Sequence, residues 1–283
     1  MIAMQEILTS IDVGLIFGVV SIGIYLTFRT INFADLTCDG SFALGSAVSA
    51  TLIVNGVNPY LASVVSLVSG GAAGFLTGIL NIKFKIADLL AGIIVAFMLY
   101  SVNLRIMNNA PNITLADEGV LFPGTNTSLA IFTIILFLVL IIVYLLFSRF
   151  GLKLRAVGYN RQFAVISGIN TNLMTIAGVS ISNALIALGG SLFSQYQGFC
   201  DISQGFGSLV IGLTSVIIGE KIFSFRKEPL IIVSCVFGSI LYRVFINVAL
   251  HGSTFGIGTQ DLNLLTGFMT IGALLIRKRC RNA

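Results

Sequence analysis

The chain has 283 residues, of which 56% are hydrophobic and only 10% are charged. A soluble domain carries about 25% charged residues, so this composition excludes a water-soluble globular protein and indicates an integral membrane protein. The hydrophobic residues occur in blocks of roughly 20 instead of alternating segments of about 10, which favours helices and excludes a transmembrane β-barrel. The net charge of +5 comes from basic residues confined to a few loops, so it reports membrane orientation and implies no nucleic acid.

The hydrophobic blocks predict an all-α bundle of about nine transmembrane spans, forming a single domain over residues 1–283. The expected spans are residues 13–28, 41–54, 60–82, 87–107, 129–147, 171–193, 206–219, 230–250 and 262–276. The fifth span holds 16 Leu, Ile, Val or Phe residues in 19, and we expect it to face lipid on all sides.

The basic residues predict the orientation of these spans. Arg29 follows the first span directly, so the positive-inside rule places the N-terminus outside. Alternating spans then bring the other basic clusters inside, at residues 83–85, 149–161, 221–227 and 277–281, and the C-terminus with them. Residues 108–128 contain no Lys or Arg and are expected to form the main external loop.

Simple counts argue against an enzyme. The single histidine, His251, cannot form an HExxH metal site and leaves any Ser/His or Cys/His system dependent on one residue. The cysteines are far apart and are interpreted mainly as small hydrophobic residues: Cys38, Cys200, Cys235 and Cys280. No lysine follows a glycine, so a P-loop is absent. We therefore expect no catalytic residues, metal or cofactor in this chain, and an energy source elsewhere.

Two segments of the sequence match each other. Residues 33–37, FADLT, resemble residues 199–203, FCDIS, and each is followed by the pattern GSxx[IL]G, at 40–45 and 207–212. One copy follows the first predicted span and the other follows the sixth, so the copies point opposite ways across the membrane. This predicts an inverted-topology repeat, typical of transporters, with halves at about 11–107 and 171–276. Coincidence in a chain rich in Gly, Ser and Phe is the alternative.

Each copy precedes a short span, and a helix can begin inside a membrane only where its free N–H groups meet protein or water. Nearby polar residues are candidates for a substrate pathway, because intramembrane charge tends to face a cavity or a partner. The candidates are Asn32, Asp35, Asp39, Asn103, Asn183, Gln195, Gln197 and Asp201, with Phe33, Phe199 and Phe206 as apolar surface. The aspartates are equally explained as caps of the helices that follow them, and the two roles are compatible.

Glycines at GxxxG spacing allow helices to approach closely, and the sequence has two such groups: Gly14 with Gly18, and Gly70 with Gly74 and Gly78. We expect these to pack helices within the bundle and not to mark a contact between subunits.

The basic loop over residues 149–170 contains a predicted short helix. Asn160 is a good N-cap and Gly168 a good C-terminal stop, which predicts about two turns of helix between them. Phe163 and Ile166 share one face of that helix. An exposed helix of this kind fits a groove on another protein. From the pattern alone, a plain surface connector remains the alternative.

These segments resemble the permease subunits of ATP-binding-cassette (ABC) importers of the branched-chain amino-acid and ribose type. LRAVGYNRQFAVISGIN, residues 154–170, is similar to their coupling segment, and INFADLTCDGSFALGS, residues 31–46, to the motif after their first conserved span. The block over residues 183–220 is closer still to a bacterial subgroup associated with tryptophan or tyrosine. The resemblance covers nearly the whole chain. Cys38, Cys200 and the short, Gly-rich loop after His251 depart from it.

The resemblance implies a homodimeric permease in the bacterial cytoplasmic (inner) membrane. Its expected partners are two cytoplasmic ATPase subunits, which bind ATP and Mg, and an extracytoplasmic binding protein that delivers an amino acid, possibly an aromatic one. It assigns ATPase coupling to Asn160, Arg161, Phe163, Ile166 and Gly168. Sugar, nucleoside or vitamin import is an alternative, because selectivity in such importers resides largely in the binding protein. An ion-coupled secondary transporter or a channel is another.

Overall fold

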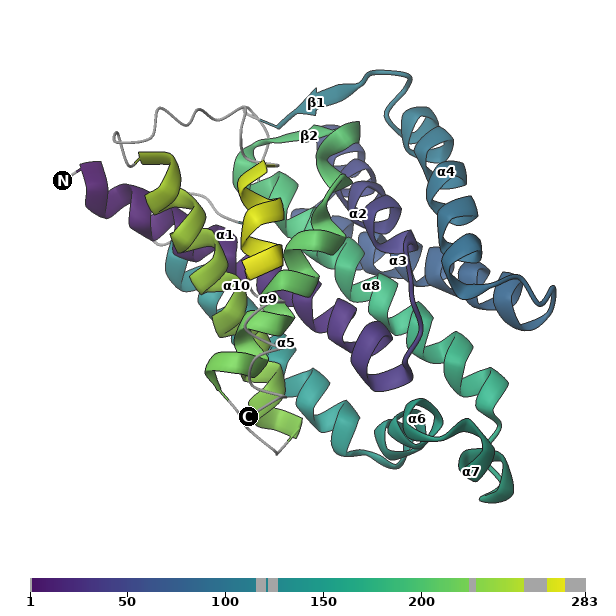
Figure 1. Ribbon diagram of the computed structural model, residues 1–283. Coiled ribbons are helices and arrows are strands. Elements are labelled where there is room, and N and C mark those ends of the chain that lie inside the picture. The colour runs from purple at the N-terminus through teal and green to yellow at the C-terminus, as the bar shows by residue number, and fades with distance from the viewer. Residues whose placement is uncertain (1, 116–120, 122–126, 224–227, 252–263, 273–283) are drawn as a thin grey trace.

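The computed structural model describes residues 2–115, 121, 127–223, 228–251 and 264–272 (Figure 1). Within these ranges, eight helices are long and apolar enough to cross a membrane, which confirms the all-α polytopic fold. Of the predicted ninth span, residues 264–272 are described and are helical. The ends of that span, the loop after His251 and the basic C-terminal tail with Cys280 lie outside the described residues.

The first half of the chain forms four membrane helices. A π-helical segment, η1, extends the first of them, and a coil over residues 32–36 leads to the second. Their bounds are α1 Ile2–Tyr25, η1 Leu26–Ile31, α2 Thr37–Val54, α3 Pro59–Ile82 and α4 Asp88–Ile106.

The first membrane span begins earlier than predicted, at Gln5. Its polar start is tolerated because Asp12, which is buried, accepts hydrogen bonds from Ser128 at 2.8 Å and from the Tyr196 hydroxyl at 3.4 Å. A satisfied carboxylate does not interrupt a span in the way that an unpaired one does.

One further span and two short helices connect the halves: α5 Thr127–Phe147, α6 Arg149–Tyr159 and α7 Arg161–Ile166. The expectation that the fifth span faces lipid on all sides is wrong. A buried stripe runs along α5 and consists of Ile131, Ile135, Ile142 and Leu146. These residues are four or seven positions apart, which places them on one face of the helix. The opposite face of α5 is exposed.

The second half of the chain follows α7. It comprises α8 Thr171–Gln197, β2 Phe199–Asp201, the 3₁₀ turn η2 Ile202–Gly205, α9 Ser208–Ile222 and α10 Glu228–His251. The expected external loop contains a short strand, β1 Asn112–Thr114, which pairs antiparallel with β2, Ile113 lying opposite Cys200. Figure 1 shows this two-stranded sheet at one end of the bundle and α6 and α7 at the other.

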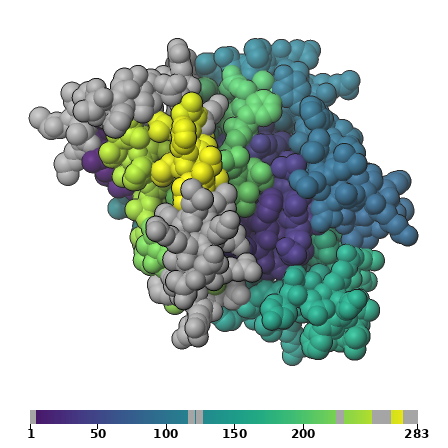
Figure 2. Space-filling model, viewed as in Figure 1, coloured from purple at the N-terminus to yellow at the C-terminus, as the bar shows by residue number. Residues whose placement is uncertain are grey.

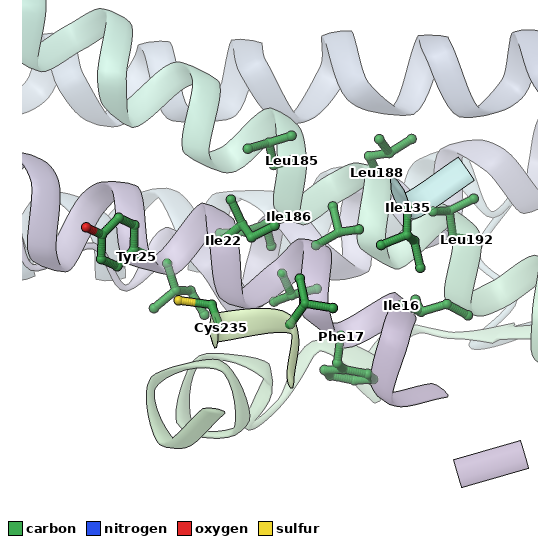
Figure 3. Packing of buried hydrophobic residues seen from close by; sticks show 14 of the residues in the cluster. Ile16, Phe17, Ile22, Tyr25, Ile135, Leu185, Ile186, Leu188, Leu192 and Cys235 are labelled. Carbon is green, nitrogen blue, oxygen red and sulfur yellow. The ribbon is translucent and has the colours of Figure 1, made fainter. Parts of the chain in front are cut away.

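The core lies where α1 crosses α8 (Figure 3). Ile16, Phe17 and Ile22 of α1 meet Ile186 and Leu192 of α8, with Ile135 of α5 and Cys235 of α10 at the edges of the same cluster. Phe17 also stacks on Phe42 of α2, with ring centroids 5.6 Å apart. Helices α1 and α8 therefore form the centre of the bundle, and the other helices pack around them.

The helices exchange partners between the halves: α3 packs on α8, and α10 packs on α1. Glycines form both contacts. A β-carbon at Gly74 would lie 2.5 Å from the Val179 carbonyl oxygen, and one at Gly14 would lie 2.7 Å from Ile240 Cα. The prediction that the GxxxG groups pack helices within the bundle is confirmed.

Candidate translocation site

The two copies of the repeated motif form the same local turn. Asp35 Oδ1 accepts the backbone N–H of Thr37 at 2.8 Å, and Asp201 Oδ1 accepts that of Ser203 at 2.7 Å. In each copy the aspartate thereby forms an Asx-type turn directly before the helical segment that follows it. The predicted capping role is confirmed for Asp201, which is the N-cap of η2, whereas the N-cap position of α2 is Leu36 and Asp35 lies one residue before it.

Asp39 caps a helix in the other half of the chain. It lies in the first turn of α2, and its Oδ1 accepts the Leu209 N–H and the Ser208 hydroxyl, both at 2.8 Å, while Oδ2 accepts the Gly207 N–H at 3.3 Å. The sequence predicted that Asp39 caps the helix that follows it. That prediction is wrong, because Asp39 already lies inside α2. The N-terminal ends of α2 and α9 therefore meet.

Helix α9 is short, and the candidate membrane span that contains it, Ile202–Ile222, also includes η2. A helix of 15 residues, such as α9, is about 22 Å long, which is shorter than the ~30 Å hydrocarbon core. Its free N–H groups need partners, and the Asp39 carboxylate supplies them. Gly207, at φ +86°, allows the tight turn that begins α9.

A cavity of about 460 Å³ lies beside this junction, within the usual range for small-molecule sites. Three elements line it: the start of α2, one face of α4 and the segment around η2. The lining residues are Leu36, Asp39, Gly40, Ala43, Ile93, Ala96, Phe97, Tyr100, Asn103, Ile202, Gly205 and Phe206. Figure 2 shows the purple residues of this part of the first half at the surface, beside the blue residues of the α3–α4 region.

The cavity brings together three of the predicted pathway residues, Asp39, Asn103 and Phe206. Asn103 is buried and, with its amide oriented to satisfy both groups, donates to the Leu99 carbonyl and accepts the Leu44 N–H, which joins α4 to α2. Phe206 is 73% exposed at the rim. The lining thus combines a few fixed polar groups with aromatic surface.

Asp35 and Asn183 lie together but away from this cavity. Both are fully buried, and the Asn183 side-chain amide donates to Asp35 Oδ2 at 2.5 Å. Ser41 donates to Asn183 Oδ1 at 2.7 Å, which completes a polar link between the start of α2 and α8.

The other candidates are distributed between the two ends of the bundle, with Phe33 packed near Leu154 of α6. Gln195 is buried and donates to Ser63 and Ser191, whereas Gln197 accepts from Gln204 at 3.0 Å. Phe33 is buried, Phe199 and Asn32 are exposed, and Asp201 is partly exposed. A pathway role for this group stays a prediction.

The short helix predicted after Asn160 is present. Asn160 Oδ1 accepts the Phe163 N–H at 3.0 Å, α7 runs from Arg161 to Ile166, and Gly168 follows at φ +75°. Phe163 is 62% exposed and Ile166 is 84% exposed at the end of the bundle opposite the sheet. The pattern did not predict α6, which buries Gly151, Leu154 and Val157; Leu154 packs against Ile31 of η1 and Val179 of α8.

The cysteines that the structure describes behave as small hydrophobic residues. Cys38, Cys200 and Cys235 are buried and form no disulfide. Burial raises the pKa of the Cys200 thiol in β2 to about 11, so it stays protonated and unreactive near neutral pH. The residues for which side chains are described contain no group of His, Cys, Asp and Glu arranged to hold a metal ion.

Sequence reasoning missed several residues of the cavity and of the helix contacts. Tyr100 and Phe97 of α4 line the cavity, although nothing in their sequence context distinguishes them from lipid-facing aromatics. Arg243, a cation within α10, lies 4.2 Å from the centroid of the Phe17 ring. A charge within a membrane span is itself a signal, and it should have been included among the candidates.

The bundle, its interlocked halves and the junction of two short helices define a membrane transport protein. The structure is similar to a solved transporter assigned to the metal-chelate type of ABC transporter, in an inward-facing conformation. The TM-score is 0.55 at 16% identity, covering 96% of this chain and 86% of that one. This likeness supports the fold.

Sequence comparison gives the family. Residues 6–274 match the model described as branched-chain amino acid transport system, permease component, and the chain belongs to this family of ABC transporter permeases. It is 38% identical to the tyrosine transport system permease protein of Clostridioides difficile (strain R20291), over 96% of this chain and 91% of that protein. It is 25% identical to the ribose import permease protein RbsC of Escherichia coli (strain K12), over 71% and 65%. Membership of this family implies ATPase partners.

Proposed function

We propose that this chain, as a homodimer, forms the membrane pathway of a bacterial importer for an amino acid, with an aromatic amino acid as the leading candidate. The observation that carries the substrate class is the likeness to the tyrosine transport permease, which extends over 96% of the chain. The cavity beside α2 and α9 is consistent with it, because Phe97, Tyr100 and Phe206 offer aromatic surface around Asp39 and Asn103.

The second protomer is proposed from the same cavity. Phe97 is 74% exposed and Phe206 is 73% exposed, so the cavity opens at the surface of one protomer. Polar groups that open toward lipid are unfavourable, whereas a second copy over α4 would enclose them in a pathway shared by the two chains. This cavity binds the amino acid weakly. Substitutions of its lining residues therefore change the rate of transport more than the affinity of the transporter for the amino acid.

The chain is oriented with its N-terminus outside and its C-terminus inside the cytoplasmic membrane. Arg29, Arg155 and Lys221 lie in elements at the end of the bundle that carries α6 and α7, which supports a cytoplasmic assignment for that end. Two ATPase subunits dock there and hold ATP and Mg. The permease itself hydrolyses nothing, and a binding protein delivers the amino acid at the opposite end.

Docking on α7 can be tested in the assembled complex. Changing Phe163 and Ile166 together to Asp places two charges on the exposed apolar face and should abolish substrate-stimulated ATP hydrolysis, with the permease still folded by size-exclusion chromatography. Phe84→Asp is the matched control, because Phe84 is 63% exposed in the turn between α3 and α4. Unchanged stimulation in the double variant would return this segment to a surface connector.

The substrate class is tested on the complex with its binding protein. ATP hydrolysis and uptake into proteoliposomes should rise with tyrosine, tryptophan or phenylalanine and not with ribose or nucleosides. Stimulation by a sugar or nucleoside alone would reject the amino-acid assignment. Uptake that follows an ion gradient without ATP would reject the importer mechanism.

A further inference from the structure

An ion pair joins the two halves at the end of the bundle that carries α6 and α7. Arg29 of η1 donates to Glu220 in the last turn of α9. The two side chains are 34% and 26% exposed, so water reaches them. A partly exposed pair contributes little to stability, so it can break and form again during a transport cycle.

The segment that carries Arg29 is an unusual piece of helix. The last six residues of this span are π-helical, and Asn32 ends them in the left-handed conformation, at φ 59°. Short π-helical segments are often found at functional sites. From Asn32 the chain runs directly into the first copy of the repeated motif, so a displacement of η1 displaces the start of α2.

Helix α6, which directly precedes α7, is in close contact with η1. A β-carbon at Gly158 of α6 would lie 1.9 Å from the Thr30 carbonyl oxygen, so the two backbones are in direct contact. Helix α8 also packs closely on η1, since a β-carbon at Gly178 would lie 2.2 Å from Ile31 Cδ1. Movement of α6 is therefore passed to η1 without an intervening flexible side chain.

There is also room for this movement. A cavity of about 460 Å³ lies between η1 and the α6–α7 pair, and Arg29, Arg155 and Phe163 are among the residues that line it. A close-packed interface has discrete arrangements and cannot slide continuously, whereas an interface beside a void can change its position.

Helix α9 is held at both ends by charged residues of the first half. Asp39 accepts hydrogen bonds from its N-terminal end, and Arg29 binds Glu220 at its C-terminal end. The N-terminal end of α9 adjoins Gly205 and Phe206, which line the cavity proposed as the pathway. A displacement of Glu220 therefore displaces α9, and the other end of α9 borders that cavity.

We propose that the Arg29–Glu220 ion pair is the link through which α6 and α7 move α9, so that ATP hydrolysis is coupled to opening of the pathway. The inference rests on the proposed function. Arg29 and Glu220 act as positioning residues in it and do not contact the substrate. Their role differs from a structural one because it affects coupling and leaves the stability of the permease nearly unchanged.

A double-mutant cycle in the reconstituted complex tests the link. The variants are Arg29→Gln, Glu220→Gln, the two together, and the charge reversal Arg29→Glu with Glu220→Arg. The measured quantity is the ATP hydrolysed per amino acid transported, with thermal stability in detergent as the structural readout. Lys221→Gln is the control, since it removes a charge next to Glu220 without breaking the pair.

Each single variant should raise the ATP cost of transport by about 5-fold or more, the low end of usual coupling between sites. The double neutral variant should be no worse than either single one, and the charge reversal should restore most of the coupling. Additive effects, or a normal ratio in all variants, would overturn the link. A wild-type complex without substrate-stimulated hydrolysis would instead reject the proposed function.

Discussion

The two copies of the repeated motif are alike in sequence and local turn but differ in what surrounds them. Asp35 and Asp201 both accept the N–H of the residue two positions on. Asp35 is fully buried and bound to Asn183, whereas Asp201 is partly exposed and also accepts the Ser203 hydroxyl. The comparison teaches that the motif specifies a helix start, and that tertiary contacts decide what each copy does.

The matching glycines differ in the same way. Gly40 lies in the first turn of α2, where a β-carbon would lie 3.0 Å from Ala96 of α4, so it serves packing. Gly207 has positive φ and open space around it, so it serves the turn before α9. An extra residue in the second copy, between the aspartate and the Gly-Ser pair, accompanies this difference.

The largest expected effect comes from the last glycine of each motif. A β-carbon at Gly45 would lie 1.9 Å from the backbone oxygen of Ala187, whereas one at Gly212 would meet Ile24 Cδ1, the end of a flexible side chain, at 2.2 Å. Gly45→Ala should destabilise the protein by more than about 3 kcal/mol, and Gly212→Ala by about 1 kcal/mol, because a side-chain end can move and a backbone cannot. Folded yield and melting temperature in detergent measure both. Equal losses would contradict the contrast between copies.

Removal of the cap on α9 should have the next largest effect. Asp39→Ala leaves the Gly207 and Leu209 N–H groups without their acceptor and should cost about 1–3 kcal/mol and most transport. Asp39→Asn retains one acceptor oxygen and should lose less stability. The same assays, with uptake into proteoliposomes, check this prediction. Normal transport in the alanine variant would show that the junction of the two helices is dispensable.

Replacement of the paired aspartates by asparagine sharpens the comparison further. At position 35 an amide nitrogen would face either the Thr37 N–H or the Asn183 amide, both of them donors, so the variant should lose about 1–3 kcal/mol. At position 201 both hydrogen bonds end on one oxygen, so Asp201→Asn should fold normally. Expression and thermal stability separate the two. Lost transport by a well-folded Asp201→Asn variant would then support the pathway role.

The smallest effect concerns the two-stranded sheet formed by β1 and β2. Cys200 is buried in β2 and the pKa of its thiol is raised to about 11, so a water-soluble maleimide should leave it unlabelled at pH 7. The raised pKa keeps the thiol protonated until the pH approaches 11, so labelling should remain slow at pH 9. A cysteine placed at Thr114, exposed in the partner strand, should react in intact cells. Absence of labelling at Thr114→Cys would contradict the N-out orientation.

Much of the fold could be predicted from the sequence, because hydrophobic blocks and basic loops report spans directly. The N-cap at Asn160 and the turns at Asp35 and Asp201 were equally predictable, since each depends on neighbours within three residues. The cap from Asp39 to α9 was not, because it joins residues about 170 positions apart. The sequence also carries no signal for the π-helical η1 or for the buried face of α5.

The central claim is that the two short helices meet beside a shared aqueous pathway, and cysteine accessibility tests it most directly. Ala96 of α4 lines the cavity, whereas Leu136 of α5 lies on the exposed face of the bundle. In a background without native cysteines, Ala96→Cys should react with a water-soluble methanethiosulfonate in the assembled transporter and be protected by transported substrate. Leu136→Cys should stay unlabelled in lipid. Labelling of Leu136→Cys alone, or of neither, would contradict the pathway.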